Sequence, residues 1–95
     1  IGEYISSVGF GEPALFYNDL GVGFAGKGFF PAANAAFKRS IELNPASSDA
    51  YFNLGLSFWK MNDKKSAARA LKKAVKINPN CLRAKSFLSE IISKK

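Results

Sequence analysis

Two segments of this 95-residue chain carry the same sparse pattern of residues, displaced from each other by 34 positions. The pattern consists of an aromatic residue, a Leu-Gly pair, a Phe, an Ala, a large apolar residue and a proline. Its first copy is Tyr17, Leu20, Gly21, Phe24, Ala33, Phe37 and Pro45, and its second copy is Tyr51, Leu54, Gly55, Phe58, Ala67, Leu71 and Pro79. A fixed period of this length is typical of a chain built from stacked copies of one supersecondary unit. The repeat therefore constrains the fold more than any other feature of the sequence.

The spacing of these residues resembles that of the tetratricopeptide repeat, a helix–turn–helix unit with the pattern W-x-x-L-G-x-x-Y, A-x-x-x-F and P. Both copies here begin with Tyr in place of Trp. The resemblance implies an all-α fold in which about five helices form a short right-handed α-solenoid. It also implies four segments: an unassigned N-terminal segment at residues 1–13, a first repeat at 14–47, a second repeat at 48–81 and a C-terminal capping helix at 82–95.

An array of this kind needs about three units, or dedicated capping helices, to bury the apolar faces of its units. Two repeats and one further helix fall short of that number, and the sequence begins with Ile1. We therefore expect the sequence to be a fragment, a processed product or the ordered part of a longer protein.

Prolines and capping residues predict where the helices begin and end. Because the residue before a proline avoids helical backbone angles, the two Asn-Pro pairs of the chain are expected to end two helices. Ser47 or Ser48, and later Asp63, can each cap a helix by accepting a hydrogen bond from a free backbone N–H. The expected helices run from Pro13 to about Ala25, from Pro31 to about Leu43, from the serines to about Met61, from Lys64 to about Ile77, and from Asn80 to Lys94.

The repeated residues have a packing explanation. The glycine of each Leu-Gly pair removes a side chain where two helices approach closely, and Ala33 and Ala67 do the same from the partner helices. The larger residues of the pattern then fill the volume around these small ones, so we predict that they form the core. In the fifth helix, Leu88 and Ile92 stand at equivalent positions.

Charge is distributed unevenly along the chain. Residues 1–37 contain one Lys and three acidic residues, a net charge of −2, whereas residues 38–95 contain thirteen Lys or Arg and four acidic residues, a net charge of +9. An apolar and weakly charged surface is typical of one that another protein covers. We therefore expect a missing repeat or a larger complex to cover residues 1–37.

The resemblance also implies a binding surface. In this family the first helices of successive repeats line a concave groove that accepts an extended peptide or a partner helix. When the repeats of this chain are aligned with the family's pattern, the groove positions are occupied by Asn18, Val22, Phe52, Asn53, Leu56, Trp59, Lys60, Arg83 and Phe87. Co-chaperone members grip an acidic C-terminal tail with five clamp residues, and only Asn53 and Arg83 match that set here. The predicted groove is aromatic and aliphatic with a basic edge, so an apolar peptide or an amphipathic helix fits it better.

The predicted groove residues are expected to have different roles. Asn53 stands where such repeats often hydrogen-bond a peptide backbone, and Trp59, outside the repeated pattern, is predicted to be a partly exposed binding residue. For Phe52 and Phe87, the alternative is that each ring only packs against a neighbouring helix. The resemblance and the groove together indicate a protein–protein interaction module, such as an adaptor, an assembly factor or an accessory subunit of a larger complex.

A basic surface on the fourth helix supports a second interpretation. Lys65, Arg69, Lys72 and Lys76 share one face of that helix. Such a face usually keeps a protein soluble, and its alternative role is electrostatic binding to an acidic partner, an anionic membrane or RNA. No aromatic residues interleave with the charges as base stacking requires, so nucleic acid is the least favoured of these partners.

Catalysis and cofactor binding find little support in the sequence. The chain has no His, one Cys and seven carboxylates, which offer neither a metal-ligand cluster nor a nucleophile–base pair. Residues 21–26 match the letters G-x-G-x-x-G, but a dinucleotide site also requires a strand–turn–helix unit, and the repeat explains Gly21 and Phe24 as packing positions. No apolar run approaches the ~20 residues of a membrane-spanning helix. The sequence therefore predicts a protein without enzymatic activity, metal or cofactor.

Overall fold

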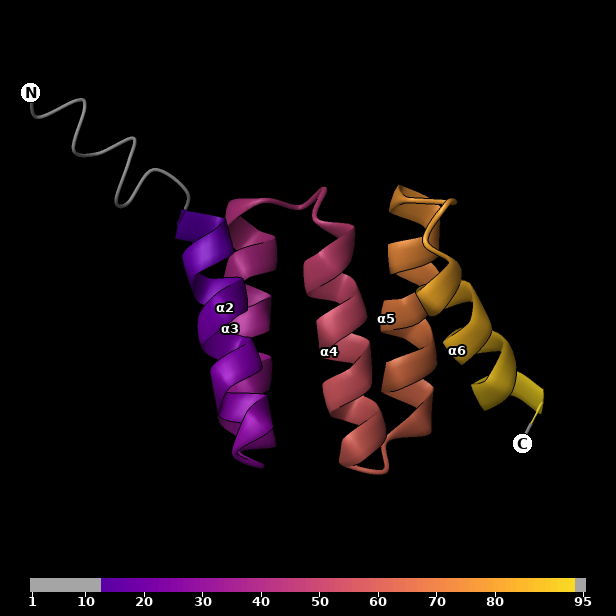
Figure 1. Ribbon diagram of the computed structural model, residues 1–95, viewed down its shortest axis with the longest axis horizontal. Coiled ribbons are helices and arrows are strands. Elements are labelled where there is room, and N and C mark those ends of the chain that lie inside the picture. The colour runs from indigo at the N-terminus through magenta and orange to yellow at the C-terminus, as the bar shows by residue number, and fades with distance from the viewer. Residues whose placement is uncertain (1–12, 94–95) are drawn as a thin grey trace, which may run out of the picture.

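The computed structural model describes residues 13–93, which form five α-helices and no strand. The helices are α2 (Pro13–Gly26), α3 (Phe30–Leu43), α4 (Ser48–Lys60), α5 (Lys64–Ile77) and α6 (Leu82–Ser93). They follow one another across the molecule, and each helix lies beside the next (Figure 1). This arrangement confirms the predicted all-α repeat fold and is compatible with a short α-solenoid, whose right-handed twist stays a prediction. Residues 1–12, within the unassigned N-terminal segment, lie outside the described residues.

The helix boundaries agree with the predicted ones to within two residues. The Ser47 hydroxyl accepts a 3.2 Å hydrogen bond from the backbone N–H of Ala50, so Ser47 and not Ser48 caps α4. Asp63 caps α5 by accepting a 3.2 Å bond from the backbone N–H of Ser66. The last helix begins at Leu82 and not at Asn80, because the preceding residues form a turn.

That turn is closed by Asn78. Its side-chain oxygen accepts a 3.1 Å bond from the backbone N–H of Asn80, and its backbone carbonyl accepts a 3.1 Å bond from the backbone N–H of Cys81. A side chain that bonds the backbone two residues later competes with the helical pattern. Asn80 therefore belongs to the turn, and α6 starts after Cys81.

Two connected clusters of buried side chains hold the helices together. One contains Ala33, Phe37, Leu54 and Ala70, and the other contains Phe52, Ala67, Leu71, Ala74, Ala84 and Ile91. A Cβ atom added to Gly21 would overlap the Phe37 ring, and one added to Gly55 would lie 2.8 Å from Cγ of Leu71. The small residues of the repeat therefore serve close helix contacts, as predicted.

Burial at the two ends of the array differs from the prediction. Leu20 is 39% exposed although its equivalent Leu54 is 7% exposed, because among the described residues no helix precedes α2. In α6 the buried isoleucine is Ile91, at 4% exposed, whereas the expected Ile92 is 47% exposed. Position 92 is equivalent to Phe58 of α4, which faces α5, the second helix of its own repeat. Among residues 13–93 no second helix follows α6, so Ile92 has no helix to pack against there. The repeat pattern thus forms a core only where the neighbouring helix is present.

Candidate functional site

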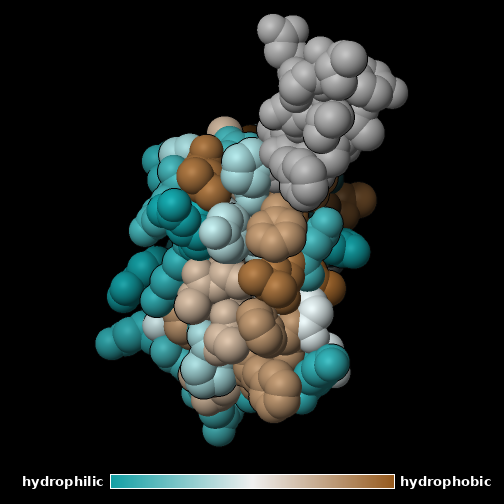
Figure 2. All heavy atoms as spheres, turned by 90° about the vertical axis from the view of Figure 1, so that its left-hand side faces the viewer, coloured by the Kyte–Doolittle hydropathy of each residue, from teal (hydrophilic) through white to brown (hydrophobic). Residues whose placement is uncertain are grey.

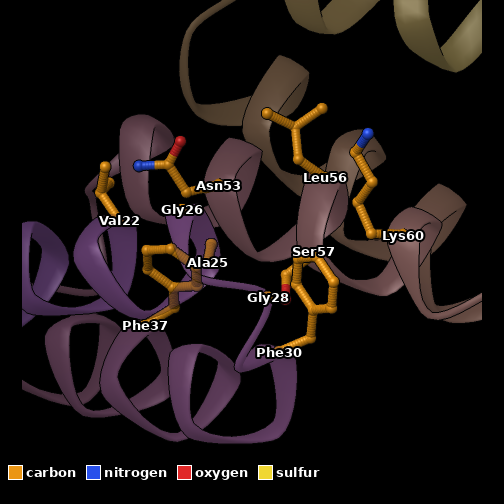
Figure 3. A pocket seen from close by; sticks show the side chains of 10 residues that line it. All are labelled: Val22, Ala25, Gly26, Gly28, Phe30, Phe37, Asn53, Leu56, Ser57 and Lys60. Carbon is orange, nitrogen blue, oxygen red and sulfur yellow. The ribbon is translucent and has the colours of Figure 1, made fainter.

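A hollow of about 510 Å³ lies between α2 and α4, and the turn after α2 and the helix α3 also contribute to its lining (Figure 3). The turn contributes Gly28 to the lining, and this residue adopts a φ of +84° that favours glycine. The residues that line it are Val22, Ala25, Gly26, Gly28, Phe30, Phe37, Asn53, Leu56, Ser57 and Lys60. Because most of these side chains are apolar and the polar ones are few, the lining resembles that of a recognition site.

Four of the nine predicted groove residues meet in this hollow. Val22 reaches it from α2, and Asn53, Leu56 and Lys60 reach it from successive turns of α4. Val22 is half exposed, Leu56 is partly buried, and Lys60 is exposed at the end of α4. The first helices of two successive repeats therefore provide an apolar wall with a single cation at its end.

Asn18, a fifth predicted residue, lies at the edge of this region and contacts Asn53. The side-chain amide of Asn53 donates a 3.0 Å hydrogen bond to the side-chain oxygen of Asn18, and both residues are partly buried. A side-chain amide carries two N–H donors and an oxygen with two lone pairs. Asn53 therefore retains one N–H and its oxygen for a ligand after it has bonded Asn18.

Ser57 also lines the hollow, although its sequence position does not predict it as a site residue. Its side chain lines the hollow, is 2% exposed, and has a hydroxyl oxygen without a hydrogen-bond partner in the structure. A buried polar atom without a partner costs roughly 1–3 kcal/mol. The equivalent residues of the other first helices are Gly23 and Ile91, so the repeat pattern contained no signal for a polar group here.

Phe52 lies outside the hollow and packs against neighbouring helices, which is the alternative that was expected for it. Its side chain is 7% exposed and packs in the core with Ala67 and Leu71 of α5 and Ala84 of α6. The guanidinium carbon of Arg83 lies 4.5 Å from the centre of the Phe52 ring and covers it. Its position in the 34-residue repeat correctly placed Phe52 on the first helix of a repeat. The ring, however, points toward α5 and α6 and packs against both helices.

Trp59 and Phe87 lie at the contact between α4 and α6 and outside the hollow. Trp59 is partly exposed, as predicted, but its ring meets Phe87 edge to face at 5.5 Å between ring centres. Both side chains also pack against the buried cluster of Phe52, Leu71 and Ile91. The alternative for Phe87, packing against a neighbouring helix, is what the structure shows, and a binding role for Trp59 stays a prediction.

The predicted basic surface is exposed along α5. Lys65, Arg69, Lys72 and Lys76 are all exposed. The first three also line a second hollow of about 590 Å³ between α5 and α6, whereas Lys76 lies outside it. The cations of α5 and the groove residues therefore belong to two separate surfaces.

Two charged groups outside both hollows have shifted pKa values. The pKa of Arg39 is raised, first by the 2.9 Å hydrogen bond that its guanidinium donates to Glu42 and second by Tyr17. The pKa of Asp63 is lowered, chiefly because its carboxylate accepts hydrogen bonds from the side chain and backbone of Ser66.

Across residues 13–93, no three His, Cys, Asp or Glu side chains are grouped so that they could hold a metal ion. None of the helices that the structure describes is long and apolar enough to cross a membrane.

Comparison with protein families settles what the repeat is. The tetratricopeptide repeat profile matches residues 18–80, which is more than half of the chain. The chain belongs to the tetratricopeptide repeat family. Tetratricopeptide repeats generally mediate protein–protein interactions and are typically not catalytic. A comparison with curated proteins found no match.

The match covers most of α2 and all of α3, α4 and α5. It thus includes both copies of the 34-residue pattern apart from Tyr17, and it ends before α6. The division of this tetratricopeptide repeat protein into segments 1–13, 14–47, 48–81 and 82–95 stays a prediction.

Proposed function

We propose that this tetratricopeptide repeat protein is a non-catalytic interaction module that binds an apolar peptide or a partner helix in the hollow between α2 and α4. The observation that carries the proposal is the meeting of Val22, Asn53, Leu56 and Lys60, from two successive first helices, around one hollow. A module of this kind serves as an adaptor, an assembly factor or an accessory subunit of a larger complex.

The chemistry of the hollow suits a peptide with apolar side chains. Val22 and Leu56 offer apolar surface, and each buried methylene of a ligand gains about 0.8 kcal/mol on leaving water. The remaining N–H and oxygen of Asn53 can bond a peptide backbone, which needs one donor and one acceptor. The unpaired hydroxyl of Ser57 supports a ligand with a polar group near the base of the hollow.

A selection from a phage-displayed library of random peptides tests this proposal. Peptides selected on the intact chain should be rich in apolar residues, and Val22→Glu should weaken their binding about tenfold or more. Leu43→Glu is the matched control, because Leu43 is also exposed and lies outside the hollow. Equal binding to wild type and Val22→Glu would contradict the proposal.

We infer that a second protein surface covers the outer face of α2. Figure 2 shows hydrophobic residues gathered in a band on the side of the molecule that carries α2. Phe16 and Leu20 are exposed there, whereas the equivalent Ala50 and Leu54 of α4 are buried against the preceding helix. This difference supports the expectation that a further repeat or a larger complex covers residues 13–37; residues 1–12 of that expectation lie outside the described part of the chain.

Electrostatic binding to an anionic membrane or RNA through residues 64–76 stays the alternative function. The exposed lysines of α5 are the observation in its favour. Binding to phosphates weakens steeply as salt rises, whereas apolar contacts in a groove depend little on salt. A titration of one partner at low and at physiological salt therefore separates the two functions.

A further inference from the structure

The hollow between α5 and α6 combines cations with an apolar base. Lys64, Lys65, Arg69 and Lys72 line it from α5, and Ile91 and Ile92 line it from α6. In Figure 1, α6 starts beside α5 and diverges from it toward the C-terminal end. The hollow has a volume of about 590 Å³ and contains no acidic residue in its lining.

The positive charge of this hollow is not a consequence of the repeat. The equivalent positions of α3 are Phe30, Pro31, Ala35 and Lys38, so three of the four cations have no counterpart in the first repeat. Packing of a second helix against a first helix therefore does not require them.

Little else in the described structure neutralises these cations. Within residues 13–93, the ion pair that the structure records joins Arg39 and Glu42, on another helix. The ammonium group of Lys64 lies 5.7 Å from the centre of the Trp59 ring, a contact that leaves its charge in place. The carboxylate of Asp63, at the start of α5, accepts hydrogen bonds from Ser66 and also attracts Arg69 and Lys65, so it offsets part of their charge. The hollow thus presents a net positive charge around an apolar base.

We propose that the α5–α6 hollow is a second binding site, which takes an acidic peptide segment that also carries apolar side chains. Carboxylates of the segment would contact the cations of α5, while an apolar side chain enters between α5 and α6 against Ile91 and Ile92. Complementary charge of this kind selects a partner and accelerates its encounter. The proposal does not depend on the groove between α2 and α4.

The shape of the hollow favours a peptide over a membrane or RNA. A bilayer is approached by apolar side chains that project from a surface, whereas Ile91 is recessed at 4% exposed and Ile92, at 47% exposed, is a single apolar side chain beside four cations. Single-stranded RNA is held by aromatic faces on which its bases stack, and the lining of this hollow contains no aromatic residue. A hollow with an apolar base and cations around it instead fits one face of a peptide.

Synthetic peptides test the site on the intact chain. The probe is a fluorescein-labelled peptide of about 12 residues with Leu residues one helical turn apart and Glu residues flanking them. A peptide of the same composition in scrambled order serves as its control. Fluorescence anisotropy reports binding of each peptide, and Trp59, the only tryptophan of the chain, lies close enough to Lys64 to report on an unlabelled copy.

Two charge-reversed variants locate the binding. Lys65→Glu with Lys72→Glu removes two cations of the hollow, and Lys73→Glu with Lys76→Glu makes the same change of net charge on the same helix outside it. We expect the first variant to bind the patterned peptide about tenfold more weakly or worse, and the second to lose no more than about threefold. Ile92→Ser should also weaken binding, because Ile92 is exposed in the hollow and its loss changes no charge. Circular dichroism checks that all three variants remain helical.

Three results would overturn the proposal. Equal losses in the two charge-reversed variants would show that the whole helix attracts anions without a defined site. Equal binding of the patterned and scrambled peptides would exclude a role for the apolar base. Binding to phosphatidylserine vesicles or to single-stranded RNA, without binding to the patterned peptide, would assign the cations to a membrane or a nucleic acid.

Discussion

The side chain of Asn53 donates a 3.0 Å hydrogen bond to the side-chain oxygen of Asn18, and this bond joins the first helices of two successive repeats. The two residues are not equivalent in the repeat, because the counterpart of Asn53 is Asp19 and the counterpart of Asn18 is Phe52. The bond therefore depends on how α2 and α4 pack and not on the 34-residue pattern. It holds the two helices at the edge of the hollow that we propose as the binding groove.

Close packing at the repeat glycines predicts opposite effects of two alanine substitutions. Gly55→Ala should destabilise the protein by about 1–3 kcal/mol, because its Cβ would lie 2.8 Å from Cγ of Leu71 and 3.3 Å from the carbonyl oxygen of Ala67. Gly23→Ala should instead stabilise it by about 0.5–1 kcal/mol, because nothing lies within 4 Å of the added Cβ. Urea denaturation measures both, and a stabilising Gly55→Ala would contradict the packing described above.

The contact between Trp59 and Phe87 predicts that the two side chains act together in fastening α6. A double-mutant cycle with Trp59→Leu and Phe87→Leu should give a coupling free energy of about 0.5–1.5 kcal/mol, as expected for an edge-to-face pair. Denaturation of wild type, both single variants and the double variant supplies the four free energies of unfolding. If the effects of the single variants simply add, the rings do not hold α6 to α4.

The fold was largely predictable from the sequence because the repeat encodes contacts between helices. Glycine at position 55 and alanine at position 67 indicate where helix axes approach, and the Asn-Pro pairs indicate where helices end. Burial was predictable only inside the array. Leu20 and Ile92 satisfy the pattern but are exposed, because burial of such a residue requires a neighbouring helix that the described part of the chain does not supply.

The candidate site was only partly predictable. Register assigns Val22, Asn53, Leu56 and Lys60 to first helices, and these residues do meet in one hollow. It could not show that the Phe52 ring enters the core under Arg83, since that depends on the placement of α6. The hollow between α5 and α6 could not be predicted either, because it also depends on the placement of α6, which diverges from α5.

The Asp63 cap of α5 predicts a pH dependence of stability. Its pKa is lowered in the folded protein, chiefly by the hydrogen bonds from Ser66. Its contribution is therefore fully present above the unfolded-state pKa of about 3.9 and is lost as the pH falls through the lower folded-state pKa. Asp63→Asn keeps a capping side chain without a titratable group, so the variant should lose less stability than wild type on acidification.

Denaturation at neutral and at acidic pH measures this difference. Asp19→Asn is a suitable control, because Asp19 is an exposed carboxylate on α2 and does not cap a helix. If Asp63→Asn and wild type lose equal stability in acid, the Asp63 carboxylate does not hold the start of α5.

The exposed apolar face of α2 predicts weaker protection of this helix in the isolated chain. Its glycines lower helix propensity, and Phe16 and Leu20 leave part of their surface in water, whereas α4 and α5 pack on both sides. Amide hydrogen exchange in monomeric protein should therefore be faster in residues 13–26 than in residues 48–77. Equal protection of the two regions would contradict the proposal that α2 needs a further partner.

A nuclear magnetic resonance titration with a peptide selected from the displayed library tests most directly whether a partner peptide enters the hollow between α2 and α4. We expect chemical-shift changes to concentrate at Val22, Asn53, Leu56 and Lys60, and the side-chain amide of Asn53 to shift with them. These changes should disappear in Val22→Glu and persist in Leu43→Glu. Shift changes confined to α5 and α6, with the residues of the hollow unaffected, would show that the peptide does not bind between α2 and α4.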